Sequence, residues 1–280
     1  MDIRDLWDFN DPSGTETKFR GALGGVPFGD PGYERDLLIK TQIARCLGLQ
    51  RKFPEANALL DEVETGIPST ALTQAYLNLE RGRTLRSSGS PELAVPFFEK
   101  AMIIADQIPD VKIDALHMLA IVSKPDEAIA LNNQAIGVAE ASTDPRARKW
   151  LGSLLNNTGW AFHDKGMYEI ALDLFERCLK YHESTGDRER ARIARWTVAR
   201  CFRSIGRFGP ALVIQRALLT DTDSDGYVHE EIGENLLALS QPEEAKPHFK
   251  RAYELLKDDP WLQDTAADRI TRIGRLGGAL

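Results

Sequence analysis

The chain has 280 residues, of which 42% are hydrophobic and 28% are charged, and its formal net charge at pH 7 is −7. This acidic balance disfavours general nucleic-acid binding, because a surface that meets phosphates has to be positive. The length alone would suggest about two ordinary domains, but a chain of stacked repeats can grow without enlarging a single core.

Residues 1–14 are acidic and contain no long apolar run, so we expect no signal peptide. No stretch approaches the roughly 18 apolar residues of a membrane span. These features predict a cytoplasmic protein that does not bind membranes. Cys46, Cys178 and Cys201 are widely spaced and lie in helical patterns, which is typical of buried, reduced thiols. No Cys/His cluster has zinc spacing, and we expect neither a metal nor a cofactor.

Apolar residues follow a helical period along most of the chain, and no segment shows the two-residue alternation of a strand. A short apolar-periodic piece at 2–10 precedes a helix that begins at Asp11-Pro12-Ser13 and ends at Gly24-Gly25, followed by a Pro/Gly linker. Helix pairs are then expected at 33–48 with 54–65, 70–88 with 91–106, 110–122 with 125–141, 146–165 with 168–184, 187–205 with 209–219, and 227–239 with 242–257. A final helix is expected at 260–276.

A spacing recurs in these pairs. The second helices carry a small residue, in turn Ala56, Ala94, Ala128, Ala171, Ala211 and Ala245, and Thr15 takes the same place in front of them. Four residues later stand Leu60, Phe98, Asn132, Phe175, Gln215 and Phe249. Twelve residues before the small residue, on the first helix, is a site that we call the contact position: Ala44, Gly82, Leu116, Gly159, Ala199 and Gly233.

Three of these contact positions are glycine, which costs about 1 kcal/mol relative to alanine inside a helix. We therefore expect the two helices of a pair to approach closely there, with the aromatic side chain filling the gap toward the next pair. Glycines at 89, 166 and 206 are expected to end the first helix of their pairs.

The combination of Gly/Ala, turn, Ala, Phe and Ala resembles the tetratricopeptide repeat, a helix–turn–helix of about 34 residues. The match is close at 81–102, 158–179 and 232–253, and several intervals are longer than 34, as in variants found in signalling and regulatory proteins. The resemblance implies an all-α, right-handed α-solenoid. We expect a single superhelical domain over 1–280, with a degenerate N-terminal cap at 1–32, six repeats at 33–257 and a capping helix at 258–280.

The resemblance also implies that the first helix of each pair lines a concave groove. The residues that it places there are Arg45, Tyr76, Arg83, Arg86, His117, Asn156, Trp160, His163, Trp196, Arg200 and Arg203. Arginine and tryptophan are enriched in binding hot spots, and arginine forks suit carboxylates. The groove is therefore predicted to bind an acidic or carboxylate-bearing peptide, whereas the alternative is that the arginines are solvated and the tryptophans pack between repeats.

Two other patterns in the sequence resemble functional motifs. Asp221, Asp223, Asp225 and Gly226 resemble the start of an EF-hand loop, but the twelfth residue is Ile232 and not the required glutamate. A turn with helix-capping aspartates is favoured, and cation binding is left open. His117 and His163 lack a nucleophile or carboxylate at motif spacing, so no enzyme is expected. The sequence predicts a non-catalytic scaffold for a protein or peptide, with a peptide-sensing regulator or a self-assembling module as alternatives.

Overall fold

The structure is a computed structural model that describes residues 2–66, 69–219 and 224–280. Within these ranges the regular elements are α-helices and one short 3₁₀ helix, and no strand is present. The elements are η1 (Ile3–Leu6), α1 (Pro12–Ala22), α2 (Tyr33–Leu49), α3 (Phe53–Thr65), α4 (Ala71–Ser87), α5 (Pro91–Ile104), α6 (Pro109–Val122), α7 (Pro125–Ala141), α8 (Pro145–Arg148), α9 (Leu151–Asp164), α10 (Tyr168–Thr185), α11 (Arg188–Ser204), α12 (Phe208–Leu219), α13 (Gly226–Ala238), α14 (Pro242–Leu256), α15 (Pro260–Thr265) and α16 (Ala267–Gly277).

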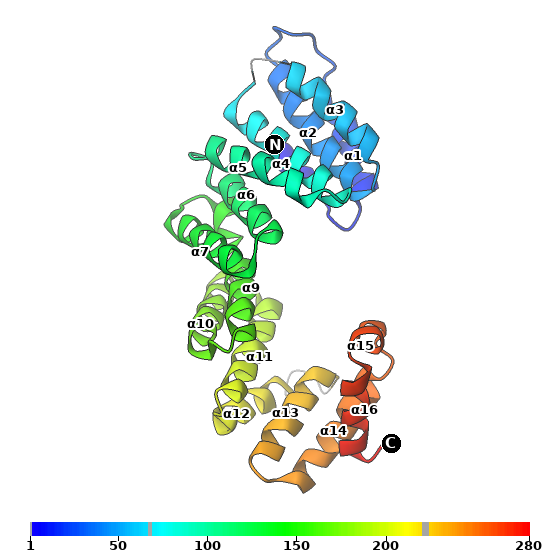
Figure 1. Ribbon diagram of the computed structural model, residues 1–280, viewed down its shortest axis with the longest axis vertical. Helices are drawn as coiled ribbons and strands as arrows, with labels where there is room; N and C mark the ends of the chain where they lie inside the picture. Colours follow the sequence, from blue (N-terminus) through cyan, green and yellow to red (C-terminus); the bar gives the residue numbers. More distant parts are fainter. Residues whose placement is uncertain (1, 67–68, 220–223) are drawn as a thin grey trace. The chain divides into compact units, whose positions relative to one another are not determined.

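The chain divides into two compact units, residues 1–154 and 155–280, and each is described by itself. In the first unit, α2 packs on α3, α4 on α5 and α6 on α7, and α1 packs on α2 in front of them (Figure 1). In the second unit, α11 packs on α12, α13 on α14, and α16 on α14. First helices of successive pairs also touch, α2 with α4, α4 with α6, and α11 with α13. The predicted all-α solenoid of helix pairs is confirmed, and the single domain over 1–280 stays a prediction.

The two departures from the expected helices are breaks. The segment predicted as one helix over 146–165 forms α8 and α9, and the final helix forms α15 and α16. In the second case Ala266 has φ −148° and ψ 36°, which lies outside the helical region and ends α15. α8 buries Ala147 and α15 buries Leu262, so the apolar pattern of the sequence continues across both breaks.

The glycines at the contact positions meet phenylalanine rings. A Cβ atom on Gly82 would lie 2.4 Å from Cε1 of Phe98, and one on Gly159 would lie 2.4 Å from Cε1 of Phe175. The distance for Gly233 and Phe249 is 2.9 Å. No side chain fits in that space, which confirms the predicted close approach.

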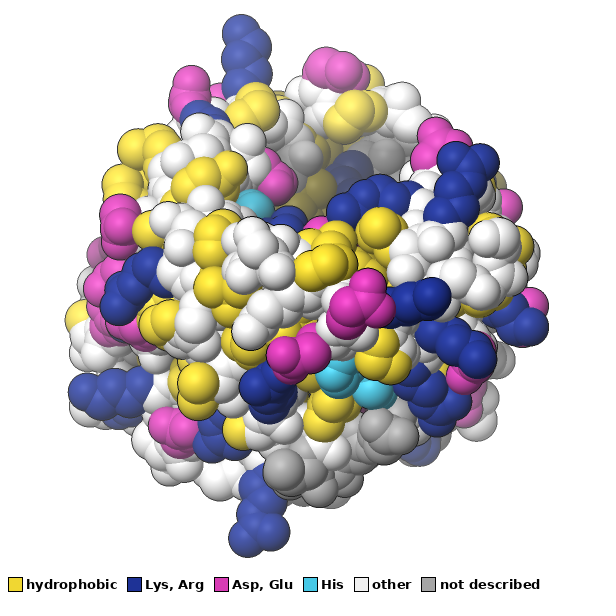
Figure 2. Space-filling view, turned by 90° about the horizontal axis from the view of Figure 1, so that it is seen from below, with side chains coloured by type: hydrophobic (Ala, Val, Ile, Leu, Met, Phe, Trp, Pro, Cys, Tyr) yellow, Lys and Arg dark blue, Asp and Glu magenta, His cyan; other side chains and the backbone are white. Residues whose placement is uncertain are grey.

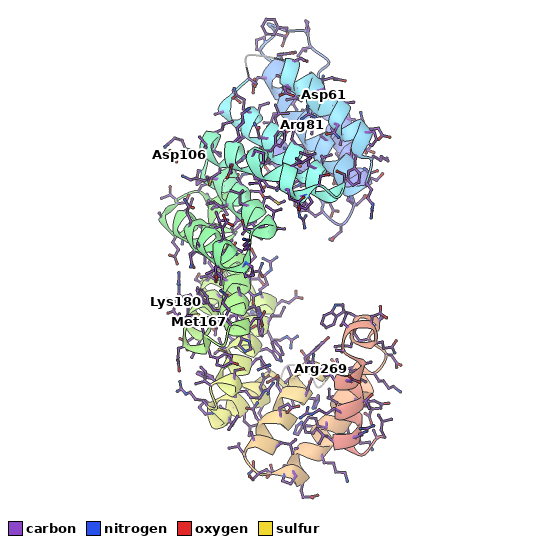
Figure 3. The ribbon with its side chains drawn as sticks, in the orientation of Figure 1. Asp61, Arg81, Asp106, Met167, Lys180 and Arg269 are labelled. Atoms are coloured by element: carbon purple, nitrogen blue, oxygen red, sulfur yellow. The ribbon has the colours of Figure 1, made fainter. Side chains whose placement is uncertain are left out.

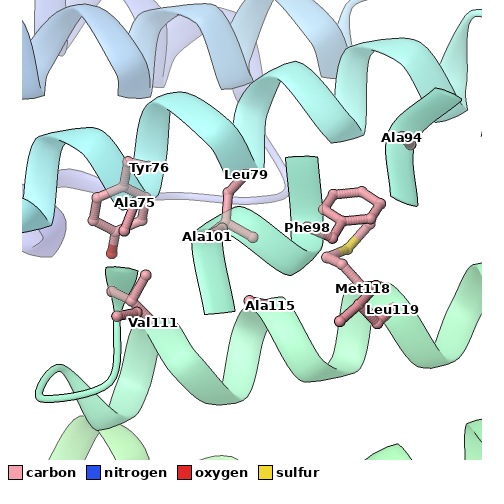
Figure 4. Close-up of a cluster of buried hydrophobic side chains, with 11 residues drawn as sticks. Ala75, Tyr76, Leu79, Ala94, Phe98, Ala101, Val111, Ala115, Met118 and Leu119 are labelled. Atoms are coloured by element: carbon pink, nitrogen blue, oxygen red, sulfur yellow. The ribbon is translucent and has the colours of Figure 1, made fainter. Parts of the chain in front are cut away.

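The ring of Phe98 also fills space toward the next pair. It belongs to a buried cluster with Ala94 of its own helix and with Met118 and Leu119 of α6 (Figure 4). In the three pairs whose contact position is Ala44, Leu116 or Ala199, the residue that corresponds to phenylalanine is Leu60, Asn132 or Gln215. A glycine at the contact position of one helix is thus matched by a phenylalanine on the other, and a larger residue at the contact position is matched by a smaller side chain than phenylalanine.

A left-handed residue stands seven positions after the contact position in five of the six pairs. Three of these residues are the predicted glycines, Gly89 (φ 98°), Gly166 (φ 73°) and Gly206 (φ 83°). In the other two pairs Arg51 (φ 63°) and Ser240 (φ 61°) adopt the same conformation with a side chain attached. The turn geometry is therefore the same whether or not glycine is present, and the two non-glycine turns carry backbone strain.

No helix within the described residues is long and apolar enough to cross a membrane.

Candidate functional site

Two tryptophans come together in the second unit. Trp160 on α9 and Trp196 on α11 have ring centroids 6.5 Å apart, and both side chains are half-buried. Trp160 also lies 5.1 Å from the buried ring of Phe175 and 5.0 Å from the ring of His163. Packing from beneath therefore holds Trp160 in place while part of its surface stays open.

Beside the tryptophans, Arg200 and Arg203 of α11 both bind Glu231 of α13. Arg203 donates to the two carboxylate oxygens at 2.8 and 3.0 Å, and Nε of Arg200 lies 3.1 Å from Oε1. The Glu231 side chain is only 4% exposed. Burial raises its pKa above the ordinary value, and the two arginines only partly offset that effect. The two guanidinium groups, which were predicted to bind a ligand, are thus held by a carboxylate of the protein.

A hydroxyl connects the arginines to the histidine. Ser204 Oγ accepts a hydrogen bond from Arg200 Nη1 at 2.7 Å and lies 2.8 Å from Nε2 of His163. Burial, followed by the positive charge of Arg200, lowers the pKa of His163. Its imidazole is therefore neutral near pH 7 and adds no positive charge to the surface.

The same balance of charge continues along α13 and α16. Arg269 binds Glu230 with an Nε–Oε1 distance of 2.7 Å, Arg272 binds Glu234, and the labelled Arg269 can be located in Figure 3. Basic, acidic and hydrophobic side chains are also interspersed on the face drawn in Figure 2. A cavity of about 290 Å³ lies beside this network and is lined by Arg192, Ile193, Trp196, Asp225 and Tyr227. The predicted groove surface of this unit is therefore charge-balanced, not basic.

In the first unit, Arg45 and Arg83 share two buried acids. Arg83 binds Glu80 and Asp114, and Nη1 of Arg45 lies 3.6 Å from Glu80 and 3.7 Å from Asp114. Burial alone would raise the pKa of Asp114, but Arg83 and Arg45 outweigh it and hold the pKa below its ordinary value. Arg86, one turn further along α4, is exposed.

The acids that hold these arginines share one place in the repeat. Glu80, Asp114 and Glu231 each stand two residues before the contact position, and Arg45, Arg83 and Arg200 each stand one residue after it in the preceding pair. Gln42 and Thr197 are buried polar residues at the same place in their own pairs. These ion pairs between neighbouring helix pairs were not predicted, although the polar residue two positions before every contact position was a signal that could have revealed them.

The remaining predicted residues are placed separately. Tyr76 is buried, and burial together with the Asp110 and Asp114 carboxylates raises its pKa to about 12. His117 is half-buried with its ring 5.6 Å from that of Trp150, and burial lowers its pKa. Asn156 is half-buried on α9 and donates to Asn157 Oδ1 at 3.3 Å.

A groove of about 840 Å³ lies next to Tyr76 in the first unit. Its lining includes Arg45, Asp110, Arg146 and Trp150, and one of its sides is made by residues of the N-terminus. The contribution of the N-terminal residues to this surface was not predicted.

Residues 221–223 of the EF-hand-like stretch lie outside the described residues. Asp225, which is described, caps α13 by accepting from the backbone N–H groups of Tyr227 and Val228 at 3.1 and 3.2 Å, as a capping aspartate was expected to do. In the ranges that the structure describes, no group of three His, Cys, Asp or Glu side chains could hold a metal ion. Burial raises the pKa of Cys46 to about 12 and the pKa of Cys178 and Cys201 to about 11, which leaves the three thiols protonated.

The fold is similar to that of solved tetratricopeptide repeat proteins. A signal transduction ATPase with numerous domains and a tetratricopeptide repeat sensor, from Pyrococcus horikoshii, matches with a TM-score of 0.71 at 12% identity, over 94% of this chain and 41% of that one. The apo form of RapI matches with a TM-score of 0.73 at 10% identity, over 92% and 76%. YrrB, described as a tetratricopeptide repeat protein with an unusual peptide-binding site, matches with a TM-score of 0.50 at 16% identity, over 69% and 92%.

This chain therefore spans less than half the length of the Pyrococcus ATPase. No family model matches the sequence, and no curated protein matches it either. At these identities the likeness establishes the tetratricopeptide repeat fold that the sequence predicted, and it establishes the fold alone.

Proposed function

We propose that this protein is a non-catalytic scaffold whose second unit binds a peptide on the surface formed by Trp160, Trp196, Arg200 and Arg203, which we call the tryptophan–arginine surface. One observation carries the proposal. Two half-buried tryptophans stand 6.5 Å apart beside two arginines whose forks are already oriented by Glu231. Side chains that are fixed before binding lose little conformational entropy when a ligand arrives, so such a surface binds more tightly than a flexible one of equal area.

The balance of positive and negative charge on the tryptophan–arginine surface limits which peptides can bind to it. A carboxylate of the ligand would share Arg200 and Arg203 with Glu231, while an apolar side chain would contact the tryptophans. Because Glu230, Glu231 and Glu234 surround these arginines, a strongly acidic peptide would be repelled as well as attracted. The ligand that fits is a peptide with one well-placed carboxylate next to an apolar residue.

The fold agrees with this proposal, since YrrB, a structural neighbour, has a peptide-binding site on the same type of repeat. The alternative of a peptide-sensing regulator draws on the neighbour from Pyrococcus horikoshii, whose repeats are described as a sensor. Both readings require peptide binding first.

The test begins with a displayed library of random dodecapeptides, selected against the full chain. Binding of the recovered peptides is then measured by fluorescence anisotropy to the wild type and to Trp196→Ala and Arg200→Gln. We expect each substitution to weaken binding by roughly tenfold or more, as truncation of a hot-spot residue does.

The matched control is Lys180→Gln, which removes one positive charge from an exposed position on α10, the second helix of its pair (Figure 3). It should leave the affinity unchanged. If the selected peptides bind Trp196→Ala and Arg200→Gln as tightly as the wild type, the tryptophan–arginine surface is not the site.

Self-association, the other alternative, is favoured by a single feature. Trp261 on α15, near the C-terminal end, is 62% exposed. If copies pair through this residue, light scattering should show a mass above that of the monomer for the wild type and the monomer mass for Trp261→Ser.

A further inference from the structure

Residues 2–9, which we call the N-terminal segment, lie across the first helices of the first unit. The segment includes only η1, a single 3₁₀ turn, yet it contacts residues of α2, α6 and α8. Its partners are Gln42, Arg45, Asp110 and Arg146, and together with Tyr76 we call them the receiving surface. The partners of Arg4 and Asp5 lie 106 and 141 residues further along the chain.

Ion pairs fix the first half of the N-terminal segment. Arg4 Nη1 donates to Asp110 Oδ2 at 2.7 Å, and the Asp110 side chain is only 10% exposed. Arg146 Nη2 donates to Asp5 Oδ1 at 2.7 Å and lies 3.2 Å from Asp2 Oδ2. Arg4 thus meets a carboxylate of the receiving surface, and Asp2 and Asp5 both meet its Arg146.

Aromatic contacts fix the second half. Trp7 Nε1 donates to the buried Gln42 Oε1 at 2.8 Å. The guanidinium carbon of Arg45 lies 5.4 Å from the centre of the Trp7 ring and 5.2 Å from that of Phe9, and these two rings stack at 4.7 Å. Arg45 therefore contacts both rings through its positive charge.

Burial of the apolar Ile3 side chain also holds the beginning of the N-terminal segment in place. Ile3 is buried in a cluster with Ile39 and Ile43 of α2 and Phe19 of α1. Local ties are also present: Arg4 Nη2 donates to Asp2 Oδ2 at 2.7 Å, and Thr15 Oγ1 lies 3.1 Å from the backbone nitrogen of Asp8 and 3.0 Å from its oxygen. The N-terminal segment is held as a bound peptide is held, through side chains that meet a surface built by distant parts of the chain.

We infer that the receiving surface is a peptide-binding site, and that its partner is a segment of another chain with an apolar residue, an arginine, an acid and a tryptophan in the order of Ile3, Arg4, Asp5 and Trp7. The order matters because each of these side chains has its own counterpart, namely the α2 cluster, Asp110, Arg146 and Gln42. This site lies in the first unit, so the inference does not rest on the tryptophan–arginine surface.

The groove of about 840 Å³ provides the approach. It runs beside the N-terminal segment and is lined on its other side by Asp144, Lys149 and Trp150. An incoming peptide can contact these residues before the resident segment leaves. Exchange then proceeds stepwise, with Asp8 and the tie to Thr15 as the point from which the segment swings away.

Tethering determines how strongly a free peptide competes. A segment joined by a short linker has an effective concentration on the order of millimolar at its own site. The wild type should therefore bind a free copy of the segment weakly. Weakening the resident copy, without changing the receiving surface, should raise the affinity for the free copy.

The test uses the full chain and a fluorescent peptide with the sequence of residues 1–10, MDIRDLWDFN. We expect Arg4→Ala and Trp7→Ala chains to bind this peptide at least tenfold more tightly than the wild type. Arg4→Ala serves as the second variant because it removes polar contacts and leaves the packing of Trp7 on Phe19 intact. Adding Arg45→Ala to either chain should abolish the gain, and a scrambled peptide of the same composition should not bind.

Arg20→Ala is the control for loss of a positive charge, since Arg20 is exposed on α1 and, within the described residues, pairs with Glu16 four residues earlier. It should bind the peptide as weakly as the wild type does. The inference is overturned if the peptide binds the wild type, Arg4→Ala and Trp7→Ala equally or not at all, or if Arg45→Ala leaves the gain in place.

Discussion

Arg200 of α11 contacts Glu231 of α13 with an Nε–Oε1 distance of 3.1 Å. Arg200 stands one residue after the contact position of its own helix pair, and Glu231 stands two residues before the contact position of the next pair. Arg83 and Asp114 repeat this relationship in the first unit, and Arg45 approaches Glu80 in the same way at 3.6 Å. The arginines of the first helices are therefore part of how neighbouring repeats are joined. Any ligand that binds them has to fit an existing ion-pair network.

Removal of the carboxylate from this network should be costly. We predict that Glu231→Gln lowers the free energy of unfolding by about 2–3 kcal/mol, because Arg200 and Arg203 lose their charged acceptor in a site with little water. Urea denaturation followed by circular dichroism measures the change. Glu244→Gln breaks the exposed pair with Arg216 and should cost less than about 1 kcal/mol; equal losses for the two variants would contradict the assignment.

The Gly82–Phe98 contact predicts a coupled pair of substitutions. Gly82→Ala should destabilise by about 1–3 kcal/mol, since the new methyl group would overlap the ring. Phe98→Leu in the same chain should recover part of that loss, because the combination reproduces the alanine and leucine at Ala44 and Leu60. A double-mutant cycle checks this. Additive effects of the two substitutions would show that the ring and the glycine do not share space.

The left-handed turns predict opposite effects of glycine at two places. Ser240→Gly should stabilise by about 0.5–1 kcal/mol, because the strain of a left-handed serine exceeds the entropy that glycine adds to the unfolded chain. Gly166→Ala should destabilise by about 1 kcal/mol or more for the converse reason. Gly137→Ala is the control, in a helical and open position of α7, and should stabilise slightly. Thermal unfolding curves of the three variants test all three signs.

Three histidines predict a loss of stability in mild acid. Burial lowers the pKa of His117, His163 and His182 in the folded chain below the ordinary value of 6.5. As the pH falls through about 6.5, the unfolded chain binds protons before the folded chain does, so stability decreases. The melting temperature should therefore be lower at pH 5.5 than at pH 7.5.

His182 offers the sharpest check of that prediction, since it is buried and lies outside the ion-pair network. His182→Gln should lose part of the dependence on pH and leave the remainder to His117 and His163. A variant that keeps the full slope between pH 7.5 and 5.5 would show that His182 does not titrate differently in the folded state.

Repeat spacing predicted the helix pairs well because packing dictates it. Glycine destabilises the interior of a helix, so Gly82, Gly159 and Gly233 indicated that the two helices of their pairs approach each other closely. The break at Ala266 was not predictable, since the apolar period of Ile270 and Ile273 gives no sign of an interruption. Likewise the role of Asp114 depends on the register between two helix pairs, and the spacing within one pair does not contain that register.

The candidate surfaces, like the fold, could be predicted from the sequence only in part. Trp160 and Trp196 were predicted to lie on first helices, and the structure brings them together. The availability of Arg200 and Arg203 could not be judged without Glu231, which is 28 residues beyond Arg203. The contribution of Arg4 and Trp7 was missed because a short stretch without a repeat pattern gives no hint of where it folds back.

The exchange of volume between glycine and phenylalanine has a consequence for how such a chain can be rebuilt. Gly159 with Phe175 and Ala44 with Leu60 are matched sets, so a helix moved alone from one repeat to another would meet either a void or a clash. A whole helix pair moved together carries its own fit with it. The smallest interchangeable part of this protein is therefore two helices with the turn between them, and shuffling experiments should cut between pairs and never within one.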